Sequence, residues 1–94
     1  MPTYERLPRF IKDFGALSRE QQLLFVAAVE KFVADLQAGK RFRKGLQVKG
    51  VQGSPGVYEL TWADDGRATF SYGKPVRDGE THVIWHRVGT HDIL

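Results

Sequence analysis

The sequence predicts an α+β fold in which two N-terminal antiparallel helices pack on a small, mainly antiparallel, twisted β-sheet. Apolar residues in the first part of the chain recur at the spacing of a helix face. Later residues alternate between apolar and polar around an Asp-Gly pair, which is the pattern of a β-hairpin. A chain of 94 residues can close one small hydrophobic core, so we expect a single domain over residues 1–94.

The first helix is expected to begin at Pro8. Proline suits a first helical turn, because its fixed backbone angle fits there and its missing N–H has no partner to lose. Gly15 marks the expected end of this short helix. The apolar residues at helical spacing are Leu7, Phe10, Ile11, Phe14 and Leu17.

A longer helix is expected to follow, between Ser18 and Gly39. Ser18, with Gln21 three residues later, has the sequence pattern of a capping box, and Gly39 suits a C-cap. Two helices cannot bury an aromatic stripe by themselves, so the rest of the chain must supply a sheet for it. The stripe consists of Phe25, Val29, Phe32, Val33 and Leu36.

Residues 57–73 are expected to form a β-hairpin. A two-residue turn would set Trp62 against Thr69 and mix apolar and polar side chains on each face. A three-residue loop, with Gly66 in the left-handed conformation as a bulge, separates the two faces. The apolar face then pairs Tyr58 with Tyr72, Leu60 with Phe70, and Trp62 with Ala68. The polar face carries Glu59, Thr61, Arg67, Thr69 and Ser71.

Two more strands complete the expected sheet. One is short and lies around residues 46–49, and the last covers residues 82–88 after a polar loop at 74–80. If the last strand runs antiparallel beside the second hairpin strand, Arg67, Arg87 and His91 meet at one end of the sheet. Trp62 is expected in the core, whereas the sequence leaves Trp85 undecided between the core and stacking on RNA.

The net charge of +3 is concentrated in the second part of the chain. Residues 1–39 carry five basic and five acidic side chains, whereas residues 40–94 carry nine and six. Such an excess suits a polyanionic partner, and a solvated surface loop accounts for it equally well. Most of the excess lies in a basic segment that contains no acid: Lys40, Arg41, Arg43, Lys44 and Lys49.

The amino-acid composition limits the possible cellular location of the protein and the kinds of chemical site it can contain. The chain has no cysteine, which excludes disulfides, a thiolate nucleophile and cysteine-bound zinc. It shows neither a signal peptide nor an apolar run of roughly 20 residues, so we expect a cytoplasmic protein without membrane contact. His82 and His86 on a strand would lie about 13 Å apart, too far to share a metal. We expect no metal and no cofactor.

The order of these segments resembles the RelE/ParE superfamily of bacterial type II toxins. The stretch Leu46-Gln47-Val48-Lys49-Gly50 is similar to a Leu-x-x-Lys-Gly-like stretch of that family. The hairpin from Tyr58 through Gly66 and Arg67 to Tyr72 resembles the family's hairpin. Arg87-Val88-Gly89-Thr90-His91 looks like the C-terminal Gly-Thr-His motif of several ribosome-dependent ribonuclease toxins. The resemblance covers nearly the whole chain.

The resemblance implies a metal-independent endoribonuclease that cuts messenger RNA in the ribosomal decoding site and is held inactive by a cognate antitoxin. Attack of a ribose 2′-hydroxyl on the adjacent phosphate needs a base, a cation and an acid. Arg67 matches the family's phosphate-binding arginine, and His91 matches the motif histidine that transfers a proton. The supporting catalytic candidates are Arg87, Glu59 and Lys49, and the RNA-binding candidates are Lys40, Arg41, Arg43 and Lys44. The implied assembly is a monomer that forms a hetero-oligomer with its antitoxin.

Three departures from the family pattern keep other functions open. Glu59 and Thr61 stand where some RNA-cleaving relatives place lysines, and Leu94 stands where several relatives carry an aromatic residue. A glutamate can act as a general base, but it can also repel RNA. The alternatives are a ParE-like inhibitor of DNA gyrase and a noncatalytic binding protein with a toxin fold.

Overall fold

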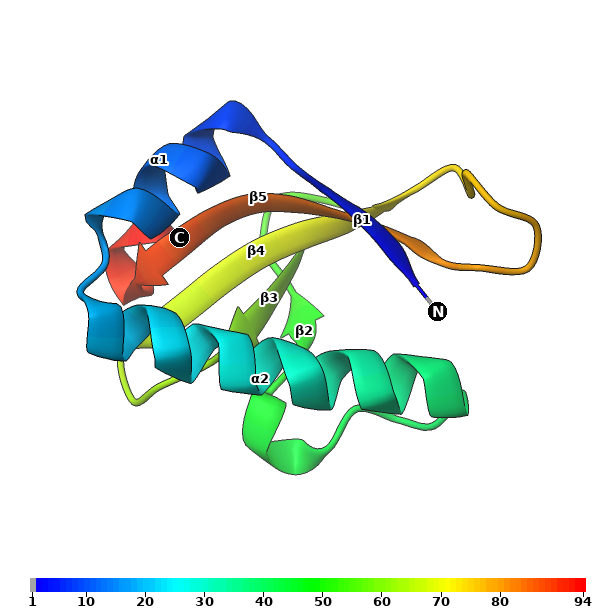
Figure 1. The fold of residues 1–94 in the computed structure, drawn as a ribbon, viewed down its shortest axis with the longest axis horizontal. Helices are drawn as coiled ribbons and strands as arrows, with labels where there is room; N and C mark the ends of the chain where they lie inside the picture. Colours follow the sequence, from blue (N-terminus) through cyan, green and yellow to red (C-terminus); the bar gives the residue numbers. More distant parts are fainter. Residues whose placement is uncertain (1) are drawn as a thin grey trace.

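The computed structural model describes residues 2–94, which form two α-helices, two short 3-10 helices and a five-stranded sheet (Figure 1). The helices are α1 (Pro8–Ala16) and α2 (Arg19–Ala38), with the 3-10 helices η1 (Lys44–Leu46) and η2 (His91–Ile93). The strands are β1 (Thr3–Arg6), β2 (Lys49–Gly50), β3 (Tyr58–Thr61), β4 (Gly66–Gly73) and β5 (His82–Thr90). The predicted fold class is confirmed.

The strands lie in the order β1-β5-β4-β3-β2, and all neighbours are antiparallel except β1 and β5. The sequence did not predict β1. This strand has only four residues, three of them exposed, so it lacks the alternating pattern that marks a strand. Its parallel pairing sets Thr3 opposite His82 and Arg6 opposite Trp85. Strand β1 is therefore an edge strand of the sheet.

The two helices have the predicted limits. Helix α1 begins at Pro8 and ends at Ala16, one residue beyond Gly15. At the start of α2, Ser18 Oγ accepts from the Gln21 N–H, and Gln21 Oε1 accepts from the Ser18 N–H, so the capping box is confirmed. Gly39 ends α2 in the left-handed conformation with φ of 66°. The chain reverses direction between the two helices (Figure 1).

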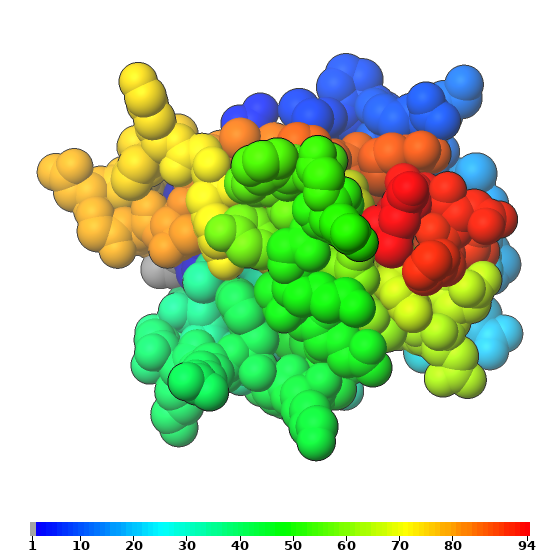
Figure 2. Space-filling model, turned by 180° about the vertical axis from the view of Figure 1, so that it is seen from behind, coloured from blue at the N-terminus to red at the C-terminus, as the bar shows by residue number. Residues whose placement is uncertain are grey.

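The segment after α2 is less regular than predicted. The strand expected around residues 46–49 is wrong in part, because Leu46 ends η1 and Gln47 is left-handed with φ of 46°. Only Lys49 and Gly50 pair with β3. Leu46 instead turns into the core, where its side chain is buried. Figure 2 shows this segment, in green, across the middle of the far side of the molecule.

The hairpin register differs from the prediction by two residues. Leu60 pairs with Ala68 rather than Phe70, and Tyr58 pairs with Phe70 rather than Tyr72. A shift of two residues leaves every side chain on its predicted face, because strands repeat with a period of two.

The predicted left-handed bulge at Gly66 is wrong, and the turn explains why. Gly66 already belongs to β4 and is absent from the glycines with positive φ in residues 2–94. Its role is steric: a Cβ there would lie 2.6 Å from the indole of Trp62, which folds over the turn. The Trp62 Nε1–H donates to the Arg67 carbonyl at 2.9 Å and fixes this arrangement. Glycine is needed for close approach rather than for backbone freedom.

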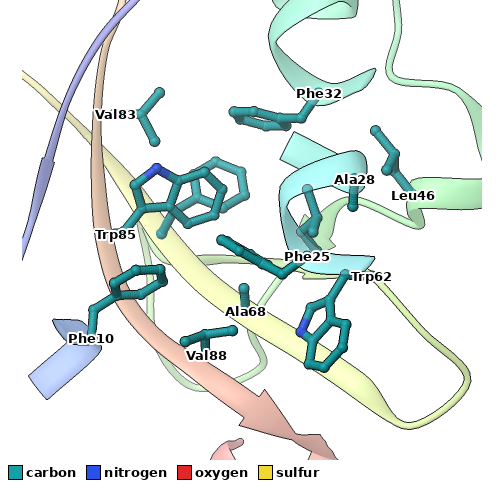
Figure 3. Packing of buried hydrophobic residues seen from close by; sticks show 12 residues of the cluster. Phe10, Phe25, Ala28, Phe32, Leu46, Trp62, Ala68, Val83, Trp85 and Val88 are labelled. Carbon is teal, nitrogen blue, oxygen red and sulfur yellow. The ribbon is translucent and has the colours of Figure 1, made fainter. Parts of the chain in front are cut away.

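The core fills the space between the helices and one face of the sheet (Figure 3). Phe32 of α2 is 1% exposed, and Phe70 of β4 is fully buried. Trp85 lies at the centre, with its ring 6.0 Å from Phe10, 5.6 Å from Phe25 and 5.4 Å from Phe70 between centroids. Both tryptophans are core residues, which confirms the prediction for Trp62 and decides the open question of Trp85.

Strand β5 contains a β-bulge that the sequence analysis did not anticipate. The register shifts between Thr69, which faces Arg87, and Phe70, which faces Trp85. Trp85 and Val88 are both buried in the core although they are three residues apart. The bulge therefore places the two intervening residues, His86 and Arg87, on the opposite face. No helix within residues 2–94 is long and apolar enough to cross a membrane.

Candidate functional site

The sheet face opposite the helices, called here the polar face, carries most of the predicted site residues. Its central row runs across four strands, since Lys49 pairs with Glu59, Glu59 with Thr69, and Thr69 with Arg87. The next row begins at Thr61 and includes Arg67, which pairs with Gly89. Four of the five predicted catalytic residues thus lie in two adjacent rows: Lys49, Glu59, Arg67 and Arg87.

Glu59 and Lys49 form an ion pair in the central row. Lys49 Nζ lies 3.8 Å from Glu59 Oε1, and the lysine is exposed while Glu59 is only 7% exposed. The lysine partly offsets the negative charge of the glutamate. Glu59, which departs from the family pattern, therefore lies beside Lys49 in the structure. The sequence alone does not reveal this contact.

The Arg67 side chain is held by its own hairpin turn. Its Nη1 donates to the carbonyl oxygens of Gly66 at 2.9 Å, Asp64 at 3.2 Å and Ala63 at 3.3 Å. Within residues 2–94 no carboxylate pairs with this guanidinium, so its positive charge stays uncompensated by a neighbour. An arginine fixed by backbone carbonyls and free of a carboxylate is suited to binding an anion.

Arg87 forms a bidentate ion pair with Asp13 of α1. Its Nε donates to Asp13 Oδ2 at 3.0 Å, and its Nη2 donates to Asp13 Oδ1 at 3.2 Å. Asp13 also accepts from the Val88 N–H at 3.3 Å. Strand β1 pairs with β5 only as far as Trp85, so this N–H has no partner on β1. Burial raises the pKa of Asp13, but the hydrogen bonds from Arg87 and Val88 outweigh it and the pKa is lowered.

The C-terminal tail folds back over the polar face. Helix η2 follows β5 directly, and a Cβ on Gly89 would lie 2.9 Å from a methyl group of Ile93. Figure 2 shows the tail, in red, beside the green segment and the yellow-green hairpin turn. His91 is exposed at the start of η2 and makes no side-chain hydrogen bond within the described residues.

The backbone positions of Arg67 and His91 lie at the same end of the sheet, and Arg87 lies a few residues away on β5. The end of β5 lies beside the start of β4, with Gly66 opposite Thr90. The side chains diverge, because Arg67 is held by the turn and Arg87 by Asp13 on α1. In residues 2–94 no hydrogen bond joins the three side chains.

The basic segment is divided by one ion pair. Arg43 donates from Nε and Nη2 to Asp35 at 2.9 and 2.8 Å, and its backbone N–H donates to the same carboxylate. These hydrogen bonds lower the pKa of Asp35 to about 2. Lys40, Arg41 and Lys44 are exposed and make no ion pair within the described residues. Arg43 thus closes the loop after α2, Lys49 pairs with Glu59, and Lys40, Arg41 and Lys44 face solvent.

A cleft of about 430 Å³ opens beside the polar face, between α2, η1 and the hairpin turn. Three cations line it, namely Lys31, Arg43 and Arg67, together with the core residues Leu46 and Trp62. Arg67 and Thr61 belong to both the cleft and the polar face, so the cleft opens at the edge of that face.

The sequence analysis missed two histidine contacts on the polar face. His86 Nε2 lies 2.7 Å from Ser71 Oγ, across the bulge. His82 is buried, and its ring nitrogens lie 2.7 Å from Thr3 Oγ1 and 2.9 Å from Glu5 Oε1 on β1. The sequence did carry a signal for the bulge. Trp85 and Val88 are both apolar but three residues apart, whereas residues on one face of a regular strand are two or four apart. Residues 2–94 contain no cluster of three or more side chains suited to hold a metal.

This sheet topology, with the helices on one face, has the fold of small toxins from toxin–antitoxin systems. The chain is similar to the Escherichia coli DinJ–YafQ toxin–antitoxin complex, with a TM-score of 0.68, 16% identity, and coverage of 99% of this chain and 96% of that one. It is also similar to a copper-bound mutant toxin from Helicobacter pylori, with a TM-score of 0.66, 19% identity, and coverage of 100% and 99%.

The intact Escherichia coli RelBE toxin–antitoxin complex gives a TM-score of 0.61 at 18% identity, covering 96% of each chain. No protein-family model matches the sequence, and no curated protein matches it significantly. The likeness therefore lies in the fold, which spans the full described chain and agrees with the RelE-like architecture predicted from the sequence.

Proposed function

We propose that the chain is the toxin of a type II toxin–antitoxin system of the RelE superfamily. It acts as a metal-independent endoribonuclease that cleaves messenger RNA on the ribosome and so inhibits translation. The observation that carries this proposal is the fold, which matches toxins from toxin–antitoxin complexes over 96% or more of both chains. The cationic polar face is a second support, because RNA backbone binding depends on positive charge.

The reaction needs three chemical roles, and the polar face has a candidate for each. Arg67 stabilises the charge that develops on the phosphate, since its guanidinium is fixed by the turn and has no carboxylate partner. Glu59 takes the proton from the attacking 2′-hydroxyl, and Lys49 lies beside it at 3.8 Å. His91, on the exposed tail, is the sequence-predicted proton-transfer residue.

Arg87 and the basic segment support these residues. Arg87 lies opposite Thr69, so its charge borders the central row even though Asp13 fixes its direction. Lys40, Arg41 and Lys44 extend the positive surface toward the ribosome or RNA, and Arg43 keeps their loop closed. In the cell, a cognate antitoxin protein binds the toxin and masks this surface; alone, the toxin is a monomer in the cytoplasm.

Alanine substitutions separate the nuclease from its alternatives. We expect Arg67→Ala and His91→Ala each to relieve growth inhibition while the protein stays folded and bound to its antitoxin. Arg19→Ala is the matched control, because Arg19 is exposed at the start of α2, away from the polar face. Full toxicity of both site variants would show that the proposed site is wrong.

The cellular target is read in the same cells. An RNA-cleaving toxin produces new transcript ends and stops translation, whereas a gyrase inhibitor changes DNA supercoiling first. A chain that causes no growth inhibition when expressed alone would contradict the toxin proposal.

A further inference from the structure

The bulge in β5 gives the polar face a histidine that the family resemblance does not point to. In a regular strand only one residue between Trp85 and Val88 would leave the core face, but here both His86 and Arg87 do so. The fold therefore adds an imidazole to the polar face, while the guanidinium of the neighbouring Arg87 turns toward Asp13 of α1. Bulges commonly re-aim side chains next to active sites.

The ring of His86 is held in one orientation by Ser71. The 2.7 Å contact joins Nε2 to Ser71 Oγ, and within residues 2–94 no protein group occupies Nδ1. The side chain is half-buried, so it is positioned by the sheet but still reaches solvent. A histidine with one nitrogen fixed and the other open is arranged to exchange a proton with a ligand.

The position of His86 complements that of Glu59. Both flank the central strand β4, where Thr69 pairs with Glu59 on one side and with Arg87 of the bulge on the other. Strands two positions apart in a sheet are separated by about 10 Å. Glu59 and Thr69 are each 7% exposed, so a phosphate group would rest on top of this row. The base and the acid of a phosphoryl transfer must act on opposite sides of the phosphorus, as these two residues would.

We propose that His86 is a catalytic residue that protonates the leaving oxygen in RNA cleavage, which rests on the proposed nuclease function. The 2′-oxygen forms a bond to phosphorus as Glu59 takes its proton, and the bond from phosphorus to the 5′-oxygen breaks. His86 gives its Nδ1 proton to that 5′-oxygen, leaving a 2′,3′-cyclic phosphate and a 5′-hydroxyl. Ser71 is a positioning residue. His86, rather than His91, is then the proton donor, and His91 on the tail binds the RNA.

The test is cleavage of messenger RNA by the full chain with purified ribosomes, with kcat and KM measured across pH. His86→Gln keeps a hydrogen bond to Ser71 but cannot act as an acid, so we expect kcat to fall by about 100-fold with little change in KM. His91→Ala should instead raise KM. Arg77→Gln, a change in the exposed loop before β5, is the control and should leave kcat unchanged.

The pH profile separates catalysis from a structural role. An acid that must be protonated makes kcat fall as pH rises past neutrality, and this fall should vanish in His86→Gln. The other titratable or charged groups around this face are unchanged in the variant; they are Glu5, Asp13, Lys49, Glu59, Arg67, His82, Arg87, His91 and Asp92.

Two outcomes are distinguishable. Wild-type kcat and an unaltered pH profile in a folded His86→Gln variant would overturn the role of His86, while loss of cleavage in Arg67→Ala would still support the nuclease. A wild-type chain that cleaves no RNA on ribosomes would overturn both proposals.

Discussion

The two faces of the sheet are built by different means. The helix-covered face is held by rings that need only be apolar and well packed, such as Phe32, Phe70 and Trp85. The polar face is held by directed contacts, in which Arg87 meets Asp13 and Lys49 meets Glu59. The first face supplies stability in proportion to buried area, and the second fixes the directions of charged groups. Substitutions on the two faces should therefore differ in size and in pH dependence.

The largest effect is expected in the core. Phe32→Ala removes a ring that is 1% exposed and contacts Phe42, Phe70 and Trp85, so unfolding should become about 3–5 kcal/mol easier. Urea unfolding followed by tryptophan fluorescence measures this change. Leu23→Ala, at a 58% exposed position on the same helix, is the control and should change the free energy of unfolding little. Equal losses in both variants would contradict the packing described.

A smaller steric effect is expected at the hairpin. Gly66→Ala would set a methyl group 2.6 Å from the Trp62 ring and should cost about 1–3 kcal/mol by thermal or urea unfolding. Gly45→Ala is the matched control, because a Cβ there meets nothing within 4 Å. If Gly66→Ala is as stable as wild type, the indole does not fold over the turn as observed.

On the polar face, the stabilising contact should depend on pH. Asp13→Asn removes the charge that Arg87 binds and should cost about 1–2 kcal/mol at neutral pH. Since the pKa of Asp13 is lowered by folding, its contribution is complete above the unfolded pKa of roughly 4 and is lost as pH falls through the folded pKa.

Free energies of unfolding for wild type and Asp13→Asn, measured from neutral pH downward, should therefore converge in acid. Asp78→Asn, in the exposed loop before β5, should show no such convergence. A difference between wild type and Asp13→Asn that stays constant into strong acid would mean that charge is not what Asp13 contributes.

The smallest effect on stability is expected in the basic segment, where the change appears in RNA binding. Replacing Lys40, Arg41 and Lys44 together should reduce the slope of log affinity against log salt for single-stranded RNA by about 2. Arg43→Ala alone should change the slope little, because Asp35 already neutralises that charge. The slopes can be measured by fluorescence anisotropy of labelled RNA titrated at several salt concentrations. If Arg43→Ala changes the slope as much as Lys44→Ala does, Arg43 is not neutralised by Asp35 as described.

The comparison of faces also explains which predictions succeeded. The caps at Ser18 and Gly39 and the stripe through Phe25 and Phe32 are local patterns, and the structure confirms them. The faces of the hairpin were also predicted, because they depend on alternation alone. Its register and the role of Gly66 were not, since both are set by Trp62 folding over the turn.

The sequence predicted that several candidate residues share one sheet face, but not the directions of their side chains. Lys49, Glu59, Arg67 and Arg87 do share one face, as alternation and strand order imply. The sequence could not show that Arg87 is directed by Asp13, which lies 74 positions earlier. It also could not show that Arg43 pairs with Asp35 of α2.

By itself, the sequence determined the fold class, the helix limits and which residues are available for chemistry, because hydrophobic periodicity and capping act over a few neighbouring positions. Only the tertiary structure decided the bulge that turns His86 to the polar face, the β1 edge strand and the partners of each arginine. These features depend on contacts between segments distant in the chain, whose free energies no local pattern encodes.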